Sequence, residues 1–252
     1  MWPERIVTPR LQAGEGPGER VIGTLRVGGF TPFTTTDYPG QLAAVVFCQG
    51  CPWRCTYCHN PHLLPTEGPE SHAWPDILAF LEKRRGLLDA VVFSGGEPTL
   101  QGGLASAMRE VKAMGFKIGL HSGGMYPDRL ARVLPLLDWI GLDVKAPLAA
   151  YPRLTGVPGS GEAVFESLGR VLVAGVDHEL RCTWHPDLLS EVDLDTLANE
   201  LLERGADRLV VQECRPAGRG ADLSTILPIQ QERGGLSALA ERFAHFTLRP
   251  SA

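Results

Sequence analysis

The chain has 252 residues, of which 44% are hydrophobic and 21% charged, and its formal net charge is −5. This length suits one large α/β domain, and the acidic balance excludes a general attraction to nucleic acid. No apolar run approaches the roughly 18 residues of a membrane span, and the start MWPERIVTPR mixes charges and prolines where a secretory signal needs an apolar segment. We therefore expect a cytoplasmic protein with neither a membrane nor a nucleic acid as partner.

Residues 1–20 contain AGEGPGER and lack periodicity, so we expect a flexible tail there and a single domain over residues 21–252. Within the domain, short apolar runs alternate with segments of helical period, which is the pattern of repeated strand-helix units around a parallel sheet. Several runs are continuously apolar, as strands covered on both faces require. Six strands are predicted: Leu42–Phe47, Ala90–Phe93, Phe116–Leu120, Trp139–Val144, Glu179–Trp184 and Leu209–Gln212.

Helices are predicted where apolar residues recur at three-to-four spacing and a glycine or a capping residue marks an end. Four such segments are Leu100 to Met114 before Gly115, Val164 to Leu172 before Gly175, Ser190 to Leu202 before Gly205, and a last helix containing Leu236, Leu239 and Phe243.

Six strand-helix units leave too little chain for an eightfold barrel, so the predicted fold is a partial (β/α)6 TIM-like barrel. A doubly wound open sheet is the alternative. The barrel is favoured because polar or glycine-rich clusters follow the ends of the predicted strands, and barrels build their sites from those loops. The clusters should therefore converge in space.

Four of the six cysteines lie between positions 48 and 58, in the segment CQGCPWRCTYCHNP after the first predicted strand. A reducing cytosol and this crowding favour metal binding over disulfides. Cys51, Cys55 and Cys58 have the spacing C-x3-C-x2-C, and thiolates are the natural ligands of iron-sulfur clusters. A four-iron cluster held by three of them keeps one iron open, where S-adenosylmethionine can bind and be cleaved to a carbon radical.

Zinc is an alternative, because Cys48 completes a set of four thiolates with the same three cysteines. The two halves of a zinc ribbon are usually separated by a dozen or more residues, whereas only three lie between Cys51 and Cys55. We interpret Cys48 as a buried thiol and leave open whether it assists the cluster. Cys182 and Cys214 are interpreted as structural for the same reason.

At these cysteines the sequence resembles the radical S-adenosylmethionine (SAM) superfamily, in which an aromatic residue precedes the third cysteine. The resemblance implies a barrel of the radical SAM type and a 4Fe-4S cluster on Cys51, Cys55 and Cys58, with SAM as second cofactor. It also implies a contact between adenine and Tyr57, for which simple packing is the alternative.

Gly95, Gly96 and Glu97 follow the second predicted strand. Adjacent glycines let the main chain approach a ligand, and a carboxylate can accept a hydrogen bond from an ammonium group. Alone, this pattern is typical of a tight turn. Beside the cysteines it matches the GGE motif of the resembled family, which implies binding of the methionyl amino group.

Asp143 and Lys145 are two apart at the end of the fourth predicted strand, so both side chains lie on one side of it. In resembling activases this segment lines the cofactor pocket, and the resemblance implies that Lys145 binds the methionyl carboxylate. Arg181, on the fifth predicted strand, is a further cofactor candidate, although a strand arginine is more often a solvated outer charge. Close relatives carry Asp-Thr-Asn-Gly where this chain has His121-Ser122-Gly123-Gly124. Ser122 keeps a hydroxyl there, and the roles of His121 and His185 stay open.

Across roughly residues 23 to 215 the chain resembles the activating enzymes of glycyl radical enzymes, most of all the type that activates anaerobic ribonucleoside-triphosphate reductase. The resemblance implies that the chain generates a glycyl radical on that partner, with a flavodoxin or ferredoxin as electron donor. The segments that carry it are Thr36-Asp37-Tyr38-Pro39-Gly40, Cys58-His59-Asn60-Pro61, Phe93 to Leu100, and Tyr151 with Leu154-Thr155-Gly156.

Two other functions stay open. A radical SAM enzyme of the same compact kind could act on a small molecule, such as a precursor of a modified base. A zinc or iron-sulfur binding module without catalytic activity is the third hypothesis.

Overall fold

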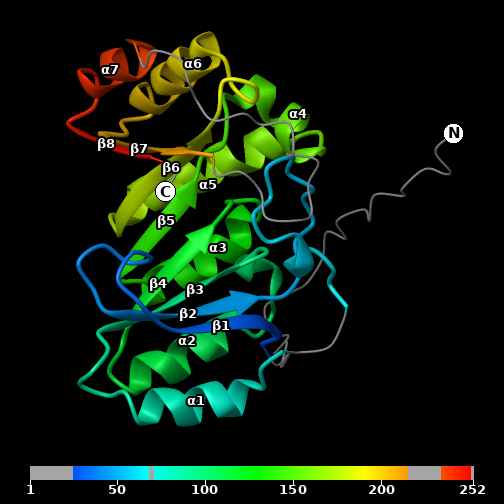
Figure 1. Cartoon of the computed structure of the whole chain (residues 1–252), viewed down its shortest axis with the longest axis vertical. Helices are drawn as coiled ribbons and strands as arrows, with labels where there is room; N and C mark the ends of the chain where they lie inside the picture. The colour runs from blue at the N-terminus through cyan, green and yellow to red at the C-terminus, as the bar shows by residue number, and fades with distance from the viewer. Residues whose placement is uncertain (1–24, 68–70, 215–233, 251–252) are drawn as a thin grey trace, which may run out of the picture.

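The computed structural model describes residues 25–67, 71–214 and 234–250, and these residues build one curved sheet with helices along its outer face (Figure 1). Residues 1–20, predicted as a tail, lie outside the described part, and the single domain stays a prediction. The strands are β1 (Val27–Thr34), β2 (Ala43–Cys48), β3 (Ala90–Gly95), β4 (Lys117–Ser122), β5 (Trp139–Asp143), β6 (Asp177–Trp184), β7 (Arg208–Glu213) and β8 (His245–Arg249).

The strands follow one another across the sheet in chain order, from β1 to β8. β1 pairs antiparallel with β2, and every later neighbouring pair is parallel. A doubly wound sheet would reverse its strand order at a switch point, so the alternative is excluded and the partial barrel is confirmed. The six predicted strands are β2 to β7, and β1 and β8 are additions at the two edges.

The helices are α1 (Trp74–Glu82), α2 (Leu104–Ala113), α3 (Pro127–Val133), α4 (Tyr151–Thr155), α5 (Ser160–Ala174), α6 (Glu191–Leu202) and α7 (Gly234–Ala240), with four single 3-10 turns at Pro61–Leu63, Pro98–Leu100, Leu134–Leu136 and Leu148–Ala150. The predicted helices correspond to α2, α5, α6 and α7. Leu100 belongs to a 3-10 turn instead of α2, and Phe243 lies beyond α7. No helix in the described ranges is long and apolar enough to cross a membrane.

The start of α6 shows why the sequence folds locally as predicted. The Ser190 hydroxyl accepts a hydrogen bond from the main-chain amide of Asp193, and the Asp193 carboxylate accepts one from the amide of Ser190. This reciprocal capping box satisfies amides that the first helical turn leaves without partners.

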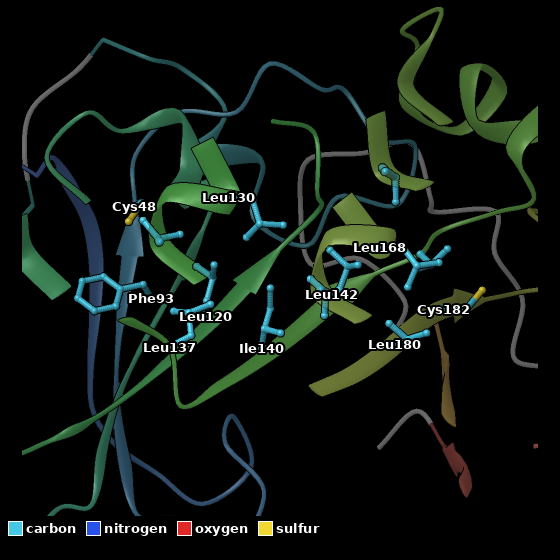
Figure 2. Packing of buried hydrophobic residues seen from close by; sticks show 14 of the residues in the cluster. Cys48, Phe93, Leu120, Leu130, Leu137, Ile140, Leu142, Leu168, Leu180 and Cys182 are labelled. Carbon is cyan, nitrogen blue, oxygen red and sulfur yellow. The ribbon is translucent and has the colours of Figure 1, made fainter. Parts of the chain in front are cut away.

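Two apolar layers hold the barrel together. The larger one lies between the outer face of the sheet and the helices, where Leu120 and Leu142 meet Leu130 of α3 and Leu168 of α5 (Figure 2). The smaller one fills the inside of the barrel and consists of Tyr38, Ala43, Val45, Ala90, Val92 and Trp139.

Tyr38 enters the barrel from the loop between β1 and β2, and its ring stacks on Trp139 with 5.1 Å between the ring centroids. Gly119 makes this possible, because a Cβ there would lie 3.1 Å from a ring carbon of Tyr38. The loop after β1 therefore closes the interior of the barrel from below, and the carboxyl ends of the strands remain for a site.

Candidate active site

A cavity of about 230 Å³ lies at the carboxyl ends of the central strands. All predicted site residues except Glu97 line it, so the loop after β2 and residues at or near the carboxyl ends of β3 to β6 converge as expected. The predicted residues in the lining are Cys51, Cys55, Tyr57, Cys58, Gly95, Gly96, Ser122, Asp143, Lys145 and Arg181. Trp53, His59, Ser94, His121, Met125, Thr183 and Gln212 are among the others.

The cysteine loop is held from outside by the end of α4. The main-chain amides of Arg54 and Thr56 donate to the carbonyls of Thr155 and Leu154, at 3.2 Å each. The Arg54 guanidinium adds a hydrogen bond of 2.8 Å to the carbonyl of Cys51. Leu154 and Thr155 therefore fix the main chain on both sides of Cys55, the second cysteine of the motif.

The four cysteines of this region separate into two kinds. Cys51, Cys55 and Cys58 line the cavity, whereas Cys48 is fully buried at the end of β2 and is not part of the lining. Among the described residues, no three His, Cys, Asp or Glu side chains are gathered around a point where a single metal ion could sit. A cluster bonds each thiolate to a different iron, so three thiols spread around one cavity suit it better than they suit zinc.

Gly95 and Gly96 join the loop after β3 to the cysteine loop. Gly95 has φ +119°, and a Cβ there would lie 2.4 Å from the main-chain nitrogen of Cys48. A Cβ on Gly96 would lie 2.3 Å from the carbonyl oxygen of Gly50. Because both distances are far below contact, only glycine permits this approach.

Glu97 turns away from the cavity and is fully buried. Its carboxylate accepts hydrogen bonds from the amide and hydroxyl of Thr99, from the Ser122 hydroxyl at 2.8 Å and from the Gly123 amide at 2.9 Å. Burial raises the pKa of Glu97, and these hydrogen bonds oppose that rise. Glu97 therefore ties the loops after β3 and β4 together, and its contact with an ammonium group stays a prediction.

Asp143 and Lys145 form an ion pair of 2.7 Å at the wall of the cavity. Burial alone would raise the pKa of Asp143, but the charge of Lys145 outweighs it and lowers that pKa. Burial alone would likewise lower the pKa of Lys145. The charge of Asp143 has the largest opposing effect, followed by Tyr57, and the pKa of Lys145 is raised well above its usual value. Both groups are therefore charged at neutral pH. The main-chain amide of Lys145 donates to the Tyr151 hydroxyl at 2.8 Å, which fixes the turn after β5.

Tyr57 provides a direct test of whether the cavity fits a further group. Its side chain is 4% exposed, and its buried hydroxyl has no hydrogen-bond partner among the described residues. A buried polar group without a partner is costly, so a bound molecule with a polar edge would satisfy it. The adenine ring of SAM has such an edge, and the residues present fit the predicted cofactors.

Arg181 lies inside the barrel, not on its outer face. Its guanidinium stands 4.9 Å from the centre of the Trp139 ring, and its Nε donates to Glu179 at 3.1 Å. A Cβ on Gly141 would lie 2.6 Å from the Arg181 Cζ. The glycine on the neighbouring strand therefore makes the room that Arg181 occupies.

His121 bridges the site to the loop after β1. Its Nε2 lies 2.8 Å from the carbonyl oxygen of Asp37, and its Nδ1 lies 3.3 Å from the Ser94 hydroxyl. Burial, and after it the charge of Arg181, lowers the pKa of His121 to about 3. Since a carbonyl only accepts, Nε2 carries the proton and Nδ1 accepts from Ser94. His185, by contrast, is buried at the end of β6 outside the cavity lining.

The sequence reasoning missed several residues of this region. Trp53 and Met125 line the cavity, and apolar residues in loops carry no pattern that would single them out. Arg249 belongs to β8, whose alternation of Phe246 and Leu248 with polar residues is a strand signal that could have been read.

Comparison with known proteins places this geometry in a family. The model of the Radical SAM superfamily matches residues 45–206. A protein of Methanocaldococcus jannaschii named as a glycyl-radical enzyme activating enzyme is 26% identical, over 82% of this chain and 87% of that protein. Pyruvate formate-lyase 1-activating enzyme of Escherichia coli strain K12 is 32% identical over 50% of this chain and 53% of its own. The S-adenosylmethionine-dependent nucleotide dehydratase of a Thermoplasmatales archaeon is 38% identical over 37% of this chain and 34% of its own.

Solved structures share the fold. SuiB of Streptococcus suis bound to S-adenosylmethionine matches with a TM-score of 0.60 and 16% identity, over 81% of this chain and 48% of that one. QueE of Escherichia coli matches with a TM-score of 0.55 and 15% identity, over 90% of this chain and 94% of that one. With the family model covering more than half of the sequence, the chain belongs to the radical SAM superfamily, whose cofactors are a 4Fe-4S cluster and S-adenosylmethionine.

Proposed function

We propose that this chain activates a glycyl radical enzyme, by using SAM to remove a hydrogen atom from a glycine of its partner. The observation that carries the proposal is the convergence of Cys51, Cys55 and Cys58 with Gly95 and Lys145 around one cavity. The names of the Methanocaldococcus and Escherichia coli relatives support this reaction class. The DYPG and CHNP segments support anaerobic ribonucleoside-triphosphate reductase as the partner.

In this proposal Cys51, Cys55 and Cys58 hold the cluster. When bound, the cluster and SAM supply a one-electron reductive cleavage that yields methionine and a carbon-centred radical. Burial raises the pKa of Cys51 to about 12, so binding iron at Cys51 releases a proton from its thiol. The main-chain support from Leu154 and Thr155 keeps the loop in place.

The remaining cavity residues hold SAM. Lys145 binds the methionyl carboxylate, and the main chain of Gly95 and Gly96 lies beside the methionyl amino group. The Tyr57 hydroxyl and ring face adenine. Ser122, Asp143 and Arg181 complete the walls of the pocket, and Glu97 acts by holding the loops that carry Gly96 and Ser122.

The reaction balances with one electron from outside, which we assign to a flavodoxin or ferredoxin. One C–S bond of SAM breaks, and one C–H bond of the glycine is exchanged for a C–H bond of 5′-deoxyadenosine. The products are methionine, 5′-deoxyadenosine and a radical on the α-carbon of the glycine. That radical stays on the partner, and the reaction needs no further oxidant.

The test uses anaerobically reconstituted protein, reduced and mixed with SAM and the reductase. We expect 5′-deoxyadenosine and a glycyl signal on the reductase by electron paramagnetic resonance. Cys55→Ala should abolish both, while Cys214→Ala, at a buried cysteine outside the cavity, should retain both. Cleavage of SAM without any radical on the reductase would contradict the proposed partner.

A small-molecule substrate is the second candidate. The match to a nucleotide dehydratase favours it, although that match covers only 37% of this chain. Turnover of a free nucleotide or modified-base precursor without a protein acceptor would replace the activase proposal with this one.

A further inference from the structure

The cysteine loop has an outer face as well as the face that lines the cavity. Arg54 and Thr56, on either side of Cys55, are exposed and do not line the cavity. Their main-chain amides are held by the carbonyls of Thr155 and Leu154, where the loop runs beside α4 (Figure 1). The loop that carries the cysteines therefore faces the cavity on one side and solvent on the other.

The charge around this outer face differs from that of the whole chain. The chain has a formal net charge of −5, but Arg54 is the only Lys, Arg, Asp or Glu in residues 49–66. The single carboxylate of residues 96–103, after β3, belongs to Glu97, which is fully buried. Residues 123–127, after β4, contain no charged side chain. The exposed charge of the cysteine loop up to residue 66 is therefore positive.

Arg54 and Arg129 are held in place by carbonyl groups. The Arg54 guanidinium donates to the carbonyl of Cys51 at 2.8 Å. Arg129, on α3, donates to the carbonyl of Leu100 at 2.8 Å, and its Cζ lies 4.8 Å from the centre of the Tyr126 ring. Within the described ranges, no ion pair joins either guanidinium to a carboxylate. Both positive charges are therefore fixed in position and are not neutralised.

Arg129 also borders the cysteine loop. A Cβ on Gly50, the residue before Cys51, would lie 2.9 Å from the side chain of Leu100, whose carbonyl holds Arg129. Arg129, like Arg54, is exposed and does not line the cavity. The two guanidinium groups therefore lie beside the loop outside the cavity.

Fixed arginines of this kind suit a partner with an acidic surface. Their remaining N–H groups can donate to carboxylates of the partner. Complementary charges at the rim of an interface accelerate the encounter and orient the partner more than they raise the affinity. An electron carrier needs this kind of contact, because it must arrive, transfer one electron and leave.

Resting on the cluster site and the external electron of the function proposed above, we propose that an acidic electron-carrier protein docks on the outer face of the cysteine loop. Its carboxylates pair with Arg54 and Arg129. The carrier is oxidised by one electron, and the cluster held by the three cysteines is reduced by the same electron. No bond forms or breaks in this step. The electron and SAM therefore reach the loop from different sides.

Arg54→Glu and Arg129→Glu test the docking in the reconstituted full-length enzyme. A reduced flavodoxin with an acidic surface is added anaerobically without SAM, and bleaching of the cluster is followed by stopped-flow absorbance. At low ionic strength we expect the second-order rate constant to fall at least tenfold in each variant, because reversed charges oppose the encounter. In about 0.5 M salt the difference should disappear, because salt screens exposed charges. Arg54→Lys keeps the charge and should keep most of the wild-type rate.

Two controls separate docking from other effects. Photoreduced 5-deazariboflavin is small and uncharged, so it should reduce the cluster of both variants at the wild-type rate. Lys83→Glu makes the same change of net charge at an exposed residue between α1 and β3, at the opposite end of the strands, and should keep the wild-type rate with flavodoxin. Iron and sulfide contents report that the cysteine loop is intact. If Arg54→Glu loses iron, Arg129→Glu decides the test.

Wild-type rates with flavodoxin in both charge-reversed variants would overturn this docking face and leave the cluster site standing. An equal loss of rate in Lys83→Glu, or with 5-deazariboflavin, would overturn it too, because net charge or a damaged cluster would then explain the effect. If the wild-type protein binds no iron, or stays oxidised with 5-deazariboflavin, the proposed function fails and this inference fails with it.

Discussion

At the scale of single residues, Lys145 links most of the charged groups of the site. It neutralises Asp143 at 2.7 Å and lies 5.7 Å from the centre of the Tyr57 ring. The same ammonium is the group we assign to the SAM carboxylate. Removing it should therefore affect the cofactor before it affects the cluster.

We predict that Lys145→Met raises the dissociation constant of SAM at least tenfold, because a charge-assisted hydrogen bond is lost and Asp143 then repels the carboxylate. Iron and sulfide contents should stay at wild-type values. Equilibrium dialysis of the reconstituted protein measures the affinity. Lys112→Met is the control, since Lys112 makes a comparable but exposed ion pair with Asp138. Equal affinities in the Lys145 variant and wild type would contradict the assigned role.

His121 should make the protein sensitive to acid. The unfolded chain takes up a proton at this residue below about pH 6.5, whereas the native protein holds it neutral down to about pH 3. Native stability is therefore lost as the pH falls between these values, by about 1.4 kcal/mol per pH unit at most. His121→Asn should flatten the fall of the unfolding free energy between pH 6 and 4, as measured by urea titration.

The exposed His62 supplies the comparison for this pH dependence. His62→Asn makes the same exchange of side chains at an exposed position, and it shows how much of a change in slope comes from the exchange itself. A His121 variant whose slope equals that of wild type would show that the native imidazole takes up its proton as readily as the unfolded one.

The residue scale also shows the limits of sequence reasoning. The sequence identified Gly95, Gly96 and Glu97 as one motif, but it could not distinguish a carboxylate that faces the cavity from one that four hydrogen bonds hold in the wall. Arg181 was equally ambiguous, because its inward position depends on the room beside Gly141 of another strand. Neighbours in space determine which way a side chain points at the end of a strand. The periodicity of the sequence carries no information about those neighbours.

At the scale of elements, the contact between the cysteine loop and the loop after β3 depends on glycine. We predict that Gly95→Ala abolishes cluster binding, because the new Cβ would overlap the main chain at Cys48. Iron and sulfide analysis with the visible absorption spectrum measures the loss. Gly115→Ala is the control: Gly115 has φ +94° but nothing within 4 Å of the added Cβ, so it should cost about 1 kcal/mol of stability and keep the cluster. A Gly95 variant with full iron and sulfide would contradict this account of the motif.

The elements that the sequence predicted are those with strong periodicity. β2, β3 and β5 are short apolar runs, α2, α5 and α6 have clear apolar faces, and a capping box opens α6. β1 was missed because two glycines and a proline interrupt it, which an edge strand tolerates. α4 has five residues, too few for a helical period, although it holds the cysteine loop.

At the scale of the whole molecule, no pairing joins β1 to β8 in the part of the chain that the structure describes, and the loop after β1 fills the interior of the barrel from below. Tyr38 is 7% exposed inside the barrel, and its ring packs on Trp139 at the start of β5, at the opposite end of the strands from the site. Because the interior is filled from below, the carboxyl ends of the strands remain as the place for a reaction. This arrangement was not predictable, because the loop has no periodicity.

We predict that Tyr38→Leu lowers the unfolding free energy by about 2–4 kcal/mol, because an aromatic stack and buried volume are lost together. Chemical denaturation measures the change. Phe33→Leu, on a side chain that is 55% exposed at the end of β1, should change the free energy by less than about 0.5 kcal/mol. Equal effects of the two substitutions would mean that the loop does not support the barrel.

The most direct test of the activase follows one hydrogen atom. Reductase labelled with deuterium at the α-carbons of its glycines is mixed with the reduced enzyme and SAM, and the 5′-deoxyadenosine is analysed by mass spectrometry. Our account predicts one deuterium in 5′-deoxyadenosine, formed together with the glycyl radical. Unlabelled 5′-deoxyadenosine in the presence of a fully labelled partner would contradict it.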